Sequence, residues 1–560
     1  MTTESRPTLW MGALVGAFWT VMLIAVFALA AQLLGTPFVP FDVFDWMARV
    51  LPGDIIRFGV GLIVSLIRTF QLGETSSVAK LGEQIMAVAG LFVTGIVIGA
   101  LLFAGLRARR IQGQTAIRLG LAVGVIAGIL IALISLGVNL TAQTSDLVSA
   151  AWIIALFAAW GTALGWSYDR LSGAESAASL STTAPASVQA IDRRRFLVTL
   201  GGAAAGFTVV GAGVSALLNA RSTSAAASAV QITPAPGATP IPVEDQPWSA
   251  TNKLPNAADP LNPAPGTRPE FTPLADHYRI DINLVPPTIV EEDWTLTVNG
   301  LVENPLTLTL ADIRANYEPM HQFVTLACIS NPIGGDLTST TRWTGFSLQQ
   351  LVEQVKPQPT ATHLRIDSVD GFTEYLALDT IQNDERVMLA YAWDGLPLEV
   401  KHGFPLRVYI PDRFGMKQPK WIVSIEFVEQ WSEGYWVRRG WDAEAIMRAT
   451  TVIDTVAVED VIQRSDGTKL IPIGGIAHAG ARGISRVEVK VDDADWVEAN
   501  LRQPLSATTW TVWRYDWPFA EGDHTFKVRC VDGDGTPQIE DHAGVSPSGA
   551  TGIHAVQRSL

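Results

Sequence analysis

Cysteine and histidine are scarce in this chain. Its 560 residues include only two cysteines, Cys328 and Cys530, and eight histidines, of which the first is His277. This count excludes a CxxC redox motif, an iron–sulfur cluster and a c-type haem attachment site. A bis-histidine haem is equally excluded from the histidine-free part before His277. We therefore expect neither a haem nor an iron–sulfur cluster in this chain.

Basic residues do not predominate either, and this argues against one class of partner. The net charge is −14, and the sequence contains no glycine-rich nucleotide-binding loop. A chain that binds nucleic acid usually carries a basic surface. We expect no nucleic-acid partner.

Charged residues are missing from long stretches near the N-terminus. Charge-free apolar runs cover Leu9–Leu34, Ile85–Leu106, Leu119–Val138, Ala150–Trp166 and Phe196–Leu218. Each is close to the ~20 residues that a helix needs to cross a bilayer. We predict a membrane region at 1–218 with about five spanning helices, the last at 196–218. The segment Ile55–Phe70 carries Arg57 and Arg68 and is too short between them to span, so we expect it to be interfacial or re-entrant.

Basic residues predict the orientation of this region. Arginines crowd 107–118 and 193–195, whereas 139–149 has none. Because cytoplasmic loops are enriched in arginine and lysine, everything after Leu218 should lie outside. The stretch Asp192–Leu197 resembles a twin-arginine export signal starting at Arg193, although an ordinary positive-inside anchor has a similar pattern. We predict a multi-pass protein of the bacterial cytoplasmic membrane with its later domains on the periplasmic or extracellular side.

Three further segments follow the membrane region. Residues 219–268 are rich in Pro, Ala and Ser and have few large apolar residues, which predicts a linker. Residues 269–448 mix alternating strand patterns with short helical ones, which indicates an α+β domain. Residues 449–560 contain alternating strand runs separated by Gly, Asp and Pro, which favours an immunoglobulin-like β-sandwich.

Cys328 is the most informative residue. It follows the apolar, strand-like run Phe323–Ala327 and precedes a turn at Ser330 and Asn331. Because a lone cysteine cannot form a thiolate cluster, it is either a nucleophile or one ligand of a metal whose other ligands belong to a cofactor. Cys530 lies on the apolar face of its run, so we expect a small buried hydrophobe there.

Several motifs around Cys328 occur in a family-specific order. Cys328 and Asn331 precede Arg342-Trp343-Thr344-Gly345, and His402-Gly403-Phe404-Pro405-Leu406-Arg407 and Lys420-Trp421 come later. This order resembles the sulfite oxidase family over roughly Phe271–Leu560. The resemblance implies a molybdopterin-binding domain, a dimerisation domain and two-electron oxygen-atom transfer. In this family one pterin dithiolene and one cysteine hold molybdenum, so the resemblance implies that Cys328 binds the metal.

The resemblance also implies the remaining site residues. We expect the pterin and its phosphate to be bound by Tyr278, Arg279, Ser368, His402, Arg407, Gly415, Met416, Lys417 and Lys420. Arginine offers a planar fork of donors and lysine a point charge, and both suit a phosphate. Tyr391 and Arg482 match residues that line the family's substrate pocket and are expected to be catalytic. A tyrosine on a strand can equally be a core aromatic, so both interpretations of Tyr391 stay open.

Departures from the family bear on the substrate. Pro332 and Ile333 stand where sulfite oxidases carry paired arginines. Near Tyr278, Asp281 occupies the position of another arginine that binds substrate in the family. A pocket without these cations should bind a dianion poorly. The substrate stays open at this point, and a neutral sulfoxide, N-oxide or similar oxygen-atom donor or acceptor fits at least as well as sulfite. The alternatives are a sulfite dehydrogenase, a reductase of sulfoxides that include oxidised methionine in proteins, and, in a different class, a non-catalytic membrane scaffold.

The chemistry requires partners. We expect a separate electron-transfer protein or quinone-linked cytochrome, because the histidine-free membrane region offers no haem ligands. We also expect a homodimer through 449–560, by resemblance to the family. Molybdenum content would distinguish the enzyme from the scaffold.

Overall fold

The computed structural model describes residues 7–179, 195–206 and 246–560. These residues form two compact units. The first contains the chain up to Leu51, the helices after Lys80 and the short segment Ile282–Thr288, and the second contains Pro52–Ala79 and most of the chain after residue 246. The predicted export motif at Arg193 and most of the predicted linker lie outside the described residues.

The first unit is helical. Its helices are α1 (Leu9–Leu34), α2 (Val39–Val50), α4 (Thr75–Ala108), α5 (Gln114–Val138) and α6 (Asp146–Ser179). By length and composition, α1, α4, α5 and the Asp146–Ser172 part of α6 could each cross a membrane. Residues 195–206 are also helical, at the start of the expected last span. The apolar runs therefore predicted the helices, although α4 and α6 extend well beyond them.

The segment expected to be interfacial or re-entrant is a separate helix, α3 (Gly53–Thr69). It follows α2 after a bend of 120°, and this bent pair is a broken span or a re-entrant loop. We had not predicted α2, which carries charged residues among its apolar ones. The buried Asp42 in α2 accepts hydrogen bonds from Ser135 and from Asn139, the latter at 2.7 Å.

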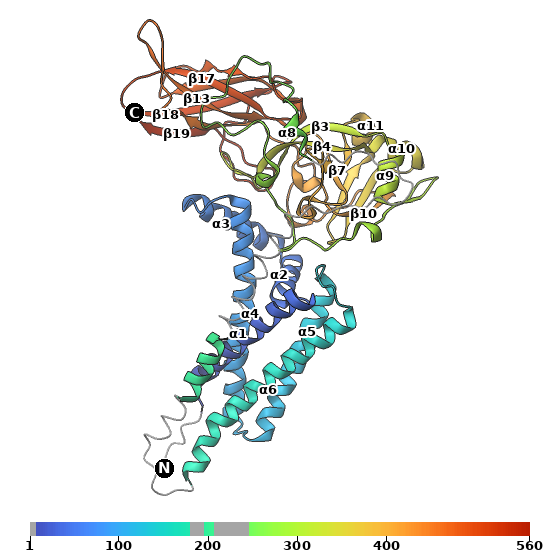
Figure 1. Cartoon of the computed structure of the whole chain (residues 1–560), viewed down its shortest axis with the longest axis vertical. Helices are drawn as coiled ribbons and strands as arrows, with labels where there is room; N and C mark the ends of the chain where they lie inside the picture. The colour runs from blue at the N-terminus through green and yellow to red at the C-terminus, as the bar shows by residue number, and fades with distance from the viewer. Residues whose placement is uncertain (1–6, 180–194, 207–245) are drawn as a thin grey trace. The chain divides into compact units, whose positions relative to one another are not determined.

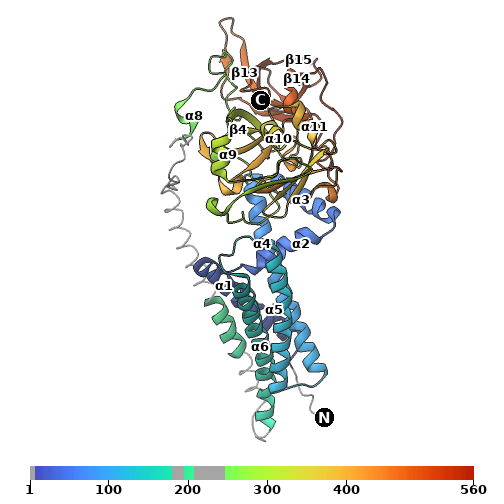
Figure 2. The same ribbon diagram turned by 90° about the vertical axis from the view of Figure 1, so that its right-hand side faces the viewer.

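Glycines allow the helices of this unit to pack closely. Helices α5 and α6 run side by side in both views (Figure 1 and Figure 2). A Cβ atom added to Gly124 would overlap the carbonyl oxygen of Phe157, and one added to Gly161 would lie 2.7 Å from the Cα of Gly124. Helices α1 and α4 meet in the same way, since a Cβ on Gly16 would lie 3.2 Å from the Cα of Gly99. Small residues at such contacts are typical of helix packing in membranes.

The second unit begins with an α+β part that contains two five-stranded sheets (Figure 1). The strands of the first sheet are β1 (Leu296–Gly300), β2 (Leu306–Leu308), β5 (His363–Ser368), β6 (Thr373–Ala377) and β10 (Ile422–Val428). The strands of the second are β3 (Met320–Ala327), β4 (Thr338–Ser347), β7 (Met388–Trp393), β8 (Leu396–Pro397) and β9 (Arg407–Tyr409). Short helices α8 (Trp248–Thr251), α9 (Leu310–Asn316), α10 (Leu348–Val355) and α11 (Leu378–Asn383) complete this part.

Sheet topology brings distant segments together. The first sheet has the order β2-β1-β10-β5-β6, in which β1 and β10 are parallel. In the second, β3 and β4 form a hairpin in which Ala327 pairs with Thr338, and β4 and β9 both pair with β7. Cys328 is the first residue of the loop that connects the two strands, as the sequence predicted for a residue that follows an apolar strand. Helix α10 is one of the short helices expected within 269–448, and its Leu348 and Leu351 are fully buried.

The C-terminal part consists of one five-stranded and one four-stranded sheet around a common core. One sheet has the order β11-β13-β17-β16 with β12 beside β13, and the other β15-β14-β18-β19. The strands are β11 (Thr450–Val456), β12 (Ile462–Gln463), β13 (Lys469–His478), β14 (Ile484–Val491), β15 (Val497–Glu498), β16 (Asn500–Leu501), β17 (Thr511–Pro518), β18 (Asp523–Asp532) and β19 (His554–Ser559). Cys530 is 1% exposed within this core, which confirms its prediction as a small buried hydrophobe.

The α5–α6 contact yields a test of helix packing. We predict that Gly124→Ala lowers the melting temperature in detergent, because its Cβ overlaps the Phe157 carbonyl and overpacking costs ~1–3 kcal/mol. Gly137→Ala is the matched control on the same helix, since nothing lies within 4 Å of a Cβ there. Equal melting temperatures for the two variants would contradict the close contact.

Candidate functional site

Cys328 lies in a turn whose backbone is fixed on both sides. Its N–H donates to the carbonyl oxygen of Leu337 at 2.9 Å, and its carbonyl accepts from the N–H of Asn331 at 3.0 Å. The Asn331 side chain accepts from the N–H of Leu337 at 3.0 Å and closes the loop. A side chain that ligates a metal needs this kind of rigid support.

The Cys328 thiol is buried, with 8% of the residue exposed. Its Sγ lies 3.0 Å from the hydroxyl oxygen of Ser330. Burial raises the pKa of the Cys328 thiol, and the hydrogen bonds with Ser330 act in the opposite direction. The thiol therefore keeps its proton at neutral pH, and a metal that binds it would have to displace that proton.

Five buried rings lie close to one another beside this turn. Tyr278, Trp343 and Trp393 belong to the same apolar cluster as Cys328. The imidazole of His402 lies 4.5 Å from the ring of Trp393, and that of His277 lies 5.2 Å from His402, both between centroids. We call these side chains the aromatic cage: His277, Tyr278, Trp343, Trp393 and His402.

Arg407 places a buried positive charge against the cage. It is the first residue of β9 and is 4% exposed, and its guanidinium carbon lies 4.6 Å from the centroid of the Trp343 ring. Its Nη1 donates to the carbonyl oxygen of His402 at 2.8 Å. Burial lowers the pKa of Arg407 to about 10, so the guanidinium remains charged at neutral pH.

Lys420 adds a second buried cation. Its Nζ donates to Asp281 at 3.2 Å and to the carbonyl oxygen of Lys401 at 3.1 Å. Arg279 also pairs with Asp281, at 2.7 Å. Burial lowers the pKa of Lys420 to about 8. Because one carboxylate serves two cations, this corner of the site carries a net positive charge that suits an anion.

Several buried polar atoms of the predicted cofactor residues and of the cage lack a hydrogen-bond partner in the part of the chain that the structure describes. Among the residues that the structure describes, these atoms have no hydrogen-bond partner: His402 Nε2, Arg407 Nε, Ser368 Oγ, Trp343 Nε1 and Trp393 Nε1. Leaving such an atom unsatisfied costs ~1–3 kcal/mol. A molybdenum–pterin group offers a metal for the thiol, ring donors and acceptors for these atoms, and a phosphate for the cations. The residues present therefore fit that group.

Three predicted cofactor residues lie beside the cage rather than in it. The Lys417 ammonium donates to the buried carboxylate of Glu374 at 2.6 Å. Gly415 leaves room for Tyr278, since a Cβ there would lie 3.2 Å from the tyrosine hydroxyl. Met416 belongs to a different apolar cluster, on the side of the Cys328 turn occupied by Phe414. Their cofactor roles stay predictions, and this geometry supports an indirect role for Lys417.

The two predicted catalytic residues also make structural contacts. Tyr391 packs in the main core, whereas its strand neighbour Ala390 faces the Cys328 cluster. This placement favours the core-aromatic interpretation of Tyr391. Arg482 donates to Asp412, to Asp532 at 3.0 Å and to the carbonyl oxygen of Met447 at 2.7 Å. Its guanidinium is thus committed to neighbouring loops.

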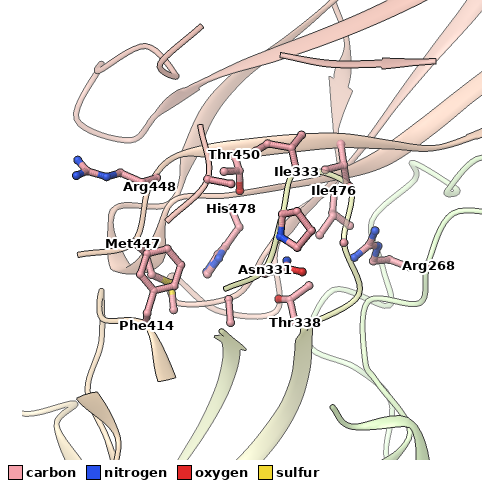
Figure 3. Close-up of a pocket in the computed structure, with 16 residues that line it drawn as sticks. Arg268, Asn331, Ile333, Thr338, Phe414, Met447, Arg448, Thr450, Ile476 and His478 are labelled. Atoms are coloured by element: carbon pink, nitrogen blue, oxygen red, sulfur yellow. The ribbon is translucent and has the colours of Figure 1, made fainter. Parts of the chain in front are cut away.

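A pocket of about 50 Å³ lies beside the Cys328 turn (Figure 3). Its labelled lining includes Asn331, Ile333, Phe414, Met447 and His478, whose side chains point toward a common space (Figure 3). Ile333 packs against an apolar cluster that contains Val452 and Ile476. Arg268 borders the pocket, but its guanidinium pairs with Asp454 at 2.6 Å. The pocket is therefore lined mainly by neutral groups.

His277, Trp343 and Trp393 are cage residues that were not among the predicted site residues. His277 is not one of the motif residues that carry the resemblance, so the resemblance gave no reason to select it. The available indication was its position directly before Tyr278, in a chain with only eight histidines.

Comparison with known proteins agrees with this geometry. Residues 283–436 match the family model described as the oxidoreductase molybdopterin binding domain. The chain is 28% identical to sulfite oxidase of Arabidopsis thaliana over 298 residues, which cover 44% of this chain and 75% of that protein. It is 31% identical to the uncharacterized oxidoreductase YuiH of Bacillus subtilis (strain 168), over 26% of this chain and 72% of that protein.

Other similar proteins share only part of their length or fold. An NADPH nitrate reductase of Fusarium oxysporum is 25% identical over 38% of this chain, which spans 28% of that enzyme. Among solved structures, the sulfane dehydrogenase SoxCD of Paracoccus pantotrophus aligns with a TM-score of 0.45 and 18% identity, over 59% of this chain and 93% of that one.

The lowered pKa of Lys420 predicts a pH dependence for the cofactor-free protein. The folded chain releases the Lys420 proton near pH 8, whereas the unfolded chain keeps it until about 10.5. Between these values the unfolded state binds more protons, so Lys420 makes the free energy of unfolding rise with pH, by at most ~1.4 kcal/mol per unit.

The measurement is the melting temperature of cofactor-free protein between pH 7.5 and 10, for wild type and Lys420→Met. We expect the difference between wild type and variant to change in favour of wild type as the pH rises. Lys420→Arg, which stays charged throughout, should lack this rise. Parallel curves for wild type and Lys420→Met would show that the lysine is not buried as a cation.

Proposed function

The chain belongs to the sulfite oxidase family of molybdopterin-dependent oxidoreductases, and from this premise we propose that it is a membrane-anchored enzyme that transfers an oxygen atom outside the cytoplasmic membrane. One observation carries the proposal: the buried Cys328 thiol shares an apolar cluster with the aromatic cage, the buried Arg407 guanidinium lies over the cage residue Trp343, and four side-chain nitrogens of the cage have no hydrogen-bond partner within the described residues. A non-catalytic scaffold would have no use for this costly arrangement.

The residues of the cage would hold the cofactor in a defined way. Cys328 would ligate molybdenum as a thiolate, with Ser330 accepting or donating at 3.0 Å from the sulfur. Arg407 and Lys420 would bind the pterin phosphate, and the free hydroxyl of Ser368 would add a hydrogen bond. When bound, the group supplies two-electron redox chemistry coupled to transfer of an oxygen atom.

The protein's own contribution is positioning and charge. Asp281 holds both Arg279 and Lys420 in place before any ligand arrives. Lys417, two residues after Gly415, pairs with Glu374 and fixes the segment that backs Tyr278. Trp343 and Trp393 exclude water, which strengthens every electrostatic interaction in the site. We propose Arg279, Met416, Gly415 and Lys417 as supporting residues of the cofactor site.

We propose a small neutral substrate, such as a sulfoxide or an N-oxide. The pocket beside the Cys328 turn supports this, because Ile333 faces an apolar cluster and the nearby Arg268 and Arg482 are already paired with carboxylates. Of the two arginines that line the pocket, Arg268 is paired with Asp454 and Arg448 donates to the carbonyl oxygen of Ser548 at 3.3 Å, so we expect the pocket to bind a dianion such as sulfite poorly. Neither Arg482 nor Tyr391 lines this pocket, so their catalytic roles stay predictions, and sulfite oxidation is the second candidate activity.

Within the residues that the structure describes, four helices are long and apolar enough to span a membrane, and they support the proposed anchor. The arginine-rich stretch at 107–118 supports an external location for the domains after the linker. Protease accessibility of the 219–268 linker in right-side-out vesicles would test this sidedness. The electrons of each turnover would pass to or from a separate redox protein or quinone-linked cytochrome.

We further propose the domain limits 269–448 and 449–560, with the second an immunoglobulin-like dimerisation domain. Its two sheets around one core support the sandwich. The twin-arginine-like start at 193 would export a domain that has already folded around its cofactor.

Substrate class is tested by kinetics on the purified full-length protein. With a reduced viologen dye as electron donor we expect turnover of a small sulfoxide or N-oxide, and with ferricyanide as acceptor we expect little oxidation of sulfite. Ile333→Arg should raise kcat/KM for sulfite about tenfold, because a new cation contributes ~1.4 kcal/mol to anion binding.

Ile333→Met is the matched control, since it preserves side-chain volume without adding charge. It should leave both activities within about twofold of wild type. Efficient sulfite oxidation by wild type, with no turnover of neutral oxygen-atom donors, would overturn the proposed substrate class and leave the cofactor assignment intact.

A further inference from the structure

His277 is held rigidly in the aromatic cage. It directly follows the short 3-10 helix η1 (Leu274–Asp276), and its N–H donates to the carbonyl oxygen of Leu274 at 3.3 Å. The next residue, Tyr278, donates its N–H to the hydroxyl of Ser339 on β4 at 3.0 Å. The imidazole is 4% exposed and stacks on the Tyr278 ring with centroids 5.6 Å apart.

Hydrogen bonding determines the tautomer of His277. Its Nδ1 lies 3.2 Å from the carbonyl oxygen of Tyr278. Because a carbonyl oxygen can only accept, Nδ1 must carry the proton. In a neutral imidazole the other nitrogen, Nε2, then presents a bare lone pair and can only accept a hydrogen bond.

The surroundings keep the imidazole neutral. Burial, with a smaller contribution from the charges of Arg407 and Lys420, lowers the pKa of His277 to about 3. A protonated His277 would also stand near two other cations, Arg407 and Lys420. At neutral pH His277 therefore offers an acceptor to the cage, whereas Arg407 and Lys420 offer donors.

The acceptor at Nε2 is unused. In the described ranges it has no hydrogen-bond partner, and the same holds for Nε2 of His402, whose ring centroid is 5.2 Å away. The unused acceptor of His277 indicates a ligand edge that carries a hydrogen-bond donor, and the neighbouring Nε2 of His402 offers a second unsatisfied nitrogen to the same ligand. To satisfy these nitrogens, a water molecule would have to enter between the Trp393 indole and the two imidazoles. The ring centroids of His277 and His402 lie 5.3 Å and 4.5 Å from that of Trp393.

We propose that His277 binds the cofactor by accepting a hydrogen bond at Nε2 from a ring N–H of the pterin. This inference rests on the proposed function and assigns a residue that lies outside the family motifs in this chain. It also divides the work within the site: the cations hold the phosphate, and His277 reads the donor edge of the pterin ring.

The test compares His277→Phe with His277→Gln in the full-length protein. Phenylalanine keeps the ring and removes the acceptor, whereas the glutamine carboxamide oxygen can still accept. Molybdenum and oxidised, fluorescent pterin are measured per chain after gel filtration, together with melting temperatures of cofactor-loaded and cofactor-free protein. His363→Phe, on the partly exposed start of β5, is the control.

We expect at least a tenfold loss of retained pterin in His277→Phe and less than a threefold loss in His277→Gln. In cofactor-free protein, His277→Phe should melt close to the wild-type temperature, because the loss of an unsatisfied buried Nε2 offsets the loss of the Nδ1–H bond to the Tyr278 carbonyl. In loaded protein the same variant should melt lower. His363→Phe should change none of these quantities.

Other outcomes overturn the proposal at different levels. Full pterin retention in His277→Phe would show that Nε2 makes no bond to the cofactor. An equal drop in melting temperature in both forms would show that His277 is a packing residue only. Wild-type protein without molybdenum or pterin, from a host that makes the cofactor, would overturn the proposed function itself.

Discussion

The buried guanidinium of Arg407 constrains the rest of the site. A charge at 4% exposure needs compensation, yet in the described part of the chain it pairs with no carboxylate. The face of Trp343 and the carbonyl oxygen of His402 stabilise it only in part. The fold therefore favours the binding of an anion next to Arg407, and the other buried groups of the site are arranged around that position. Asp281 keeps Lys420 close without neutralising the whole cluster.

Much of this arrangement was predictable from the sequence, because the chemistry sits in short local motifs. Cys328 follows a strand, and Arg407 begins one, so their positions could be read from strand patterns. The direction of a side chain could not. Tyr391 matches a family position, but it faces the main core, since one step along a strand reverses the face. The resemblance assigned Lys417 to the cofactor, but the sequence could not reveal its ion pair with Glu374, which lies 43 residues away in sequence.

The helical unit shows the same division. Apolar runs identified α1, α4, α5 and α6, because length and composition decide whether a helix can span. They could not reveal which helices pair, since pairing depends on glycines such as Gly124 and Gly161 meeting across an interface. Helix α2 escaped prediction because its buried Asp42 finds partners on α5, which no local pattern reports.

The central claim is that the buried cysteine Cys328 ligates molybdenum beside this cage. Molybdenum K-edge X-ray absorption on the purified full-length protein tests it most directly. The account predicts sulfur neighbours from one dithiolene plus the Cys328 sulfur in wild type, and one sulfur neighbour fewer in Cys328→Ser. An identical sulfur shell in the two proteins would contradict the assignment of Cys328 as the metal ligand.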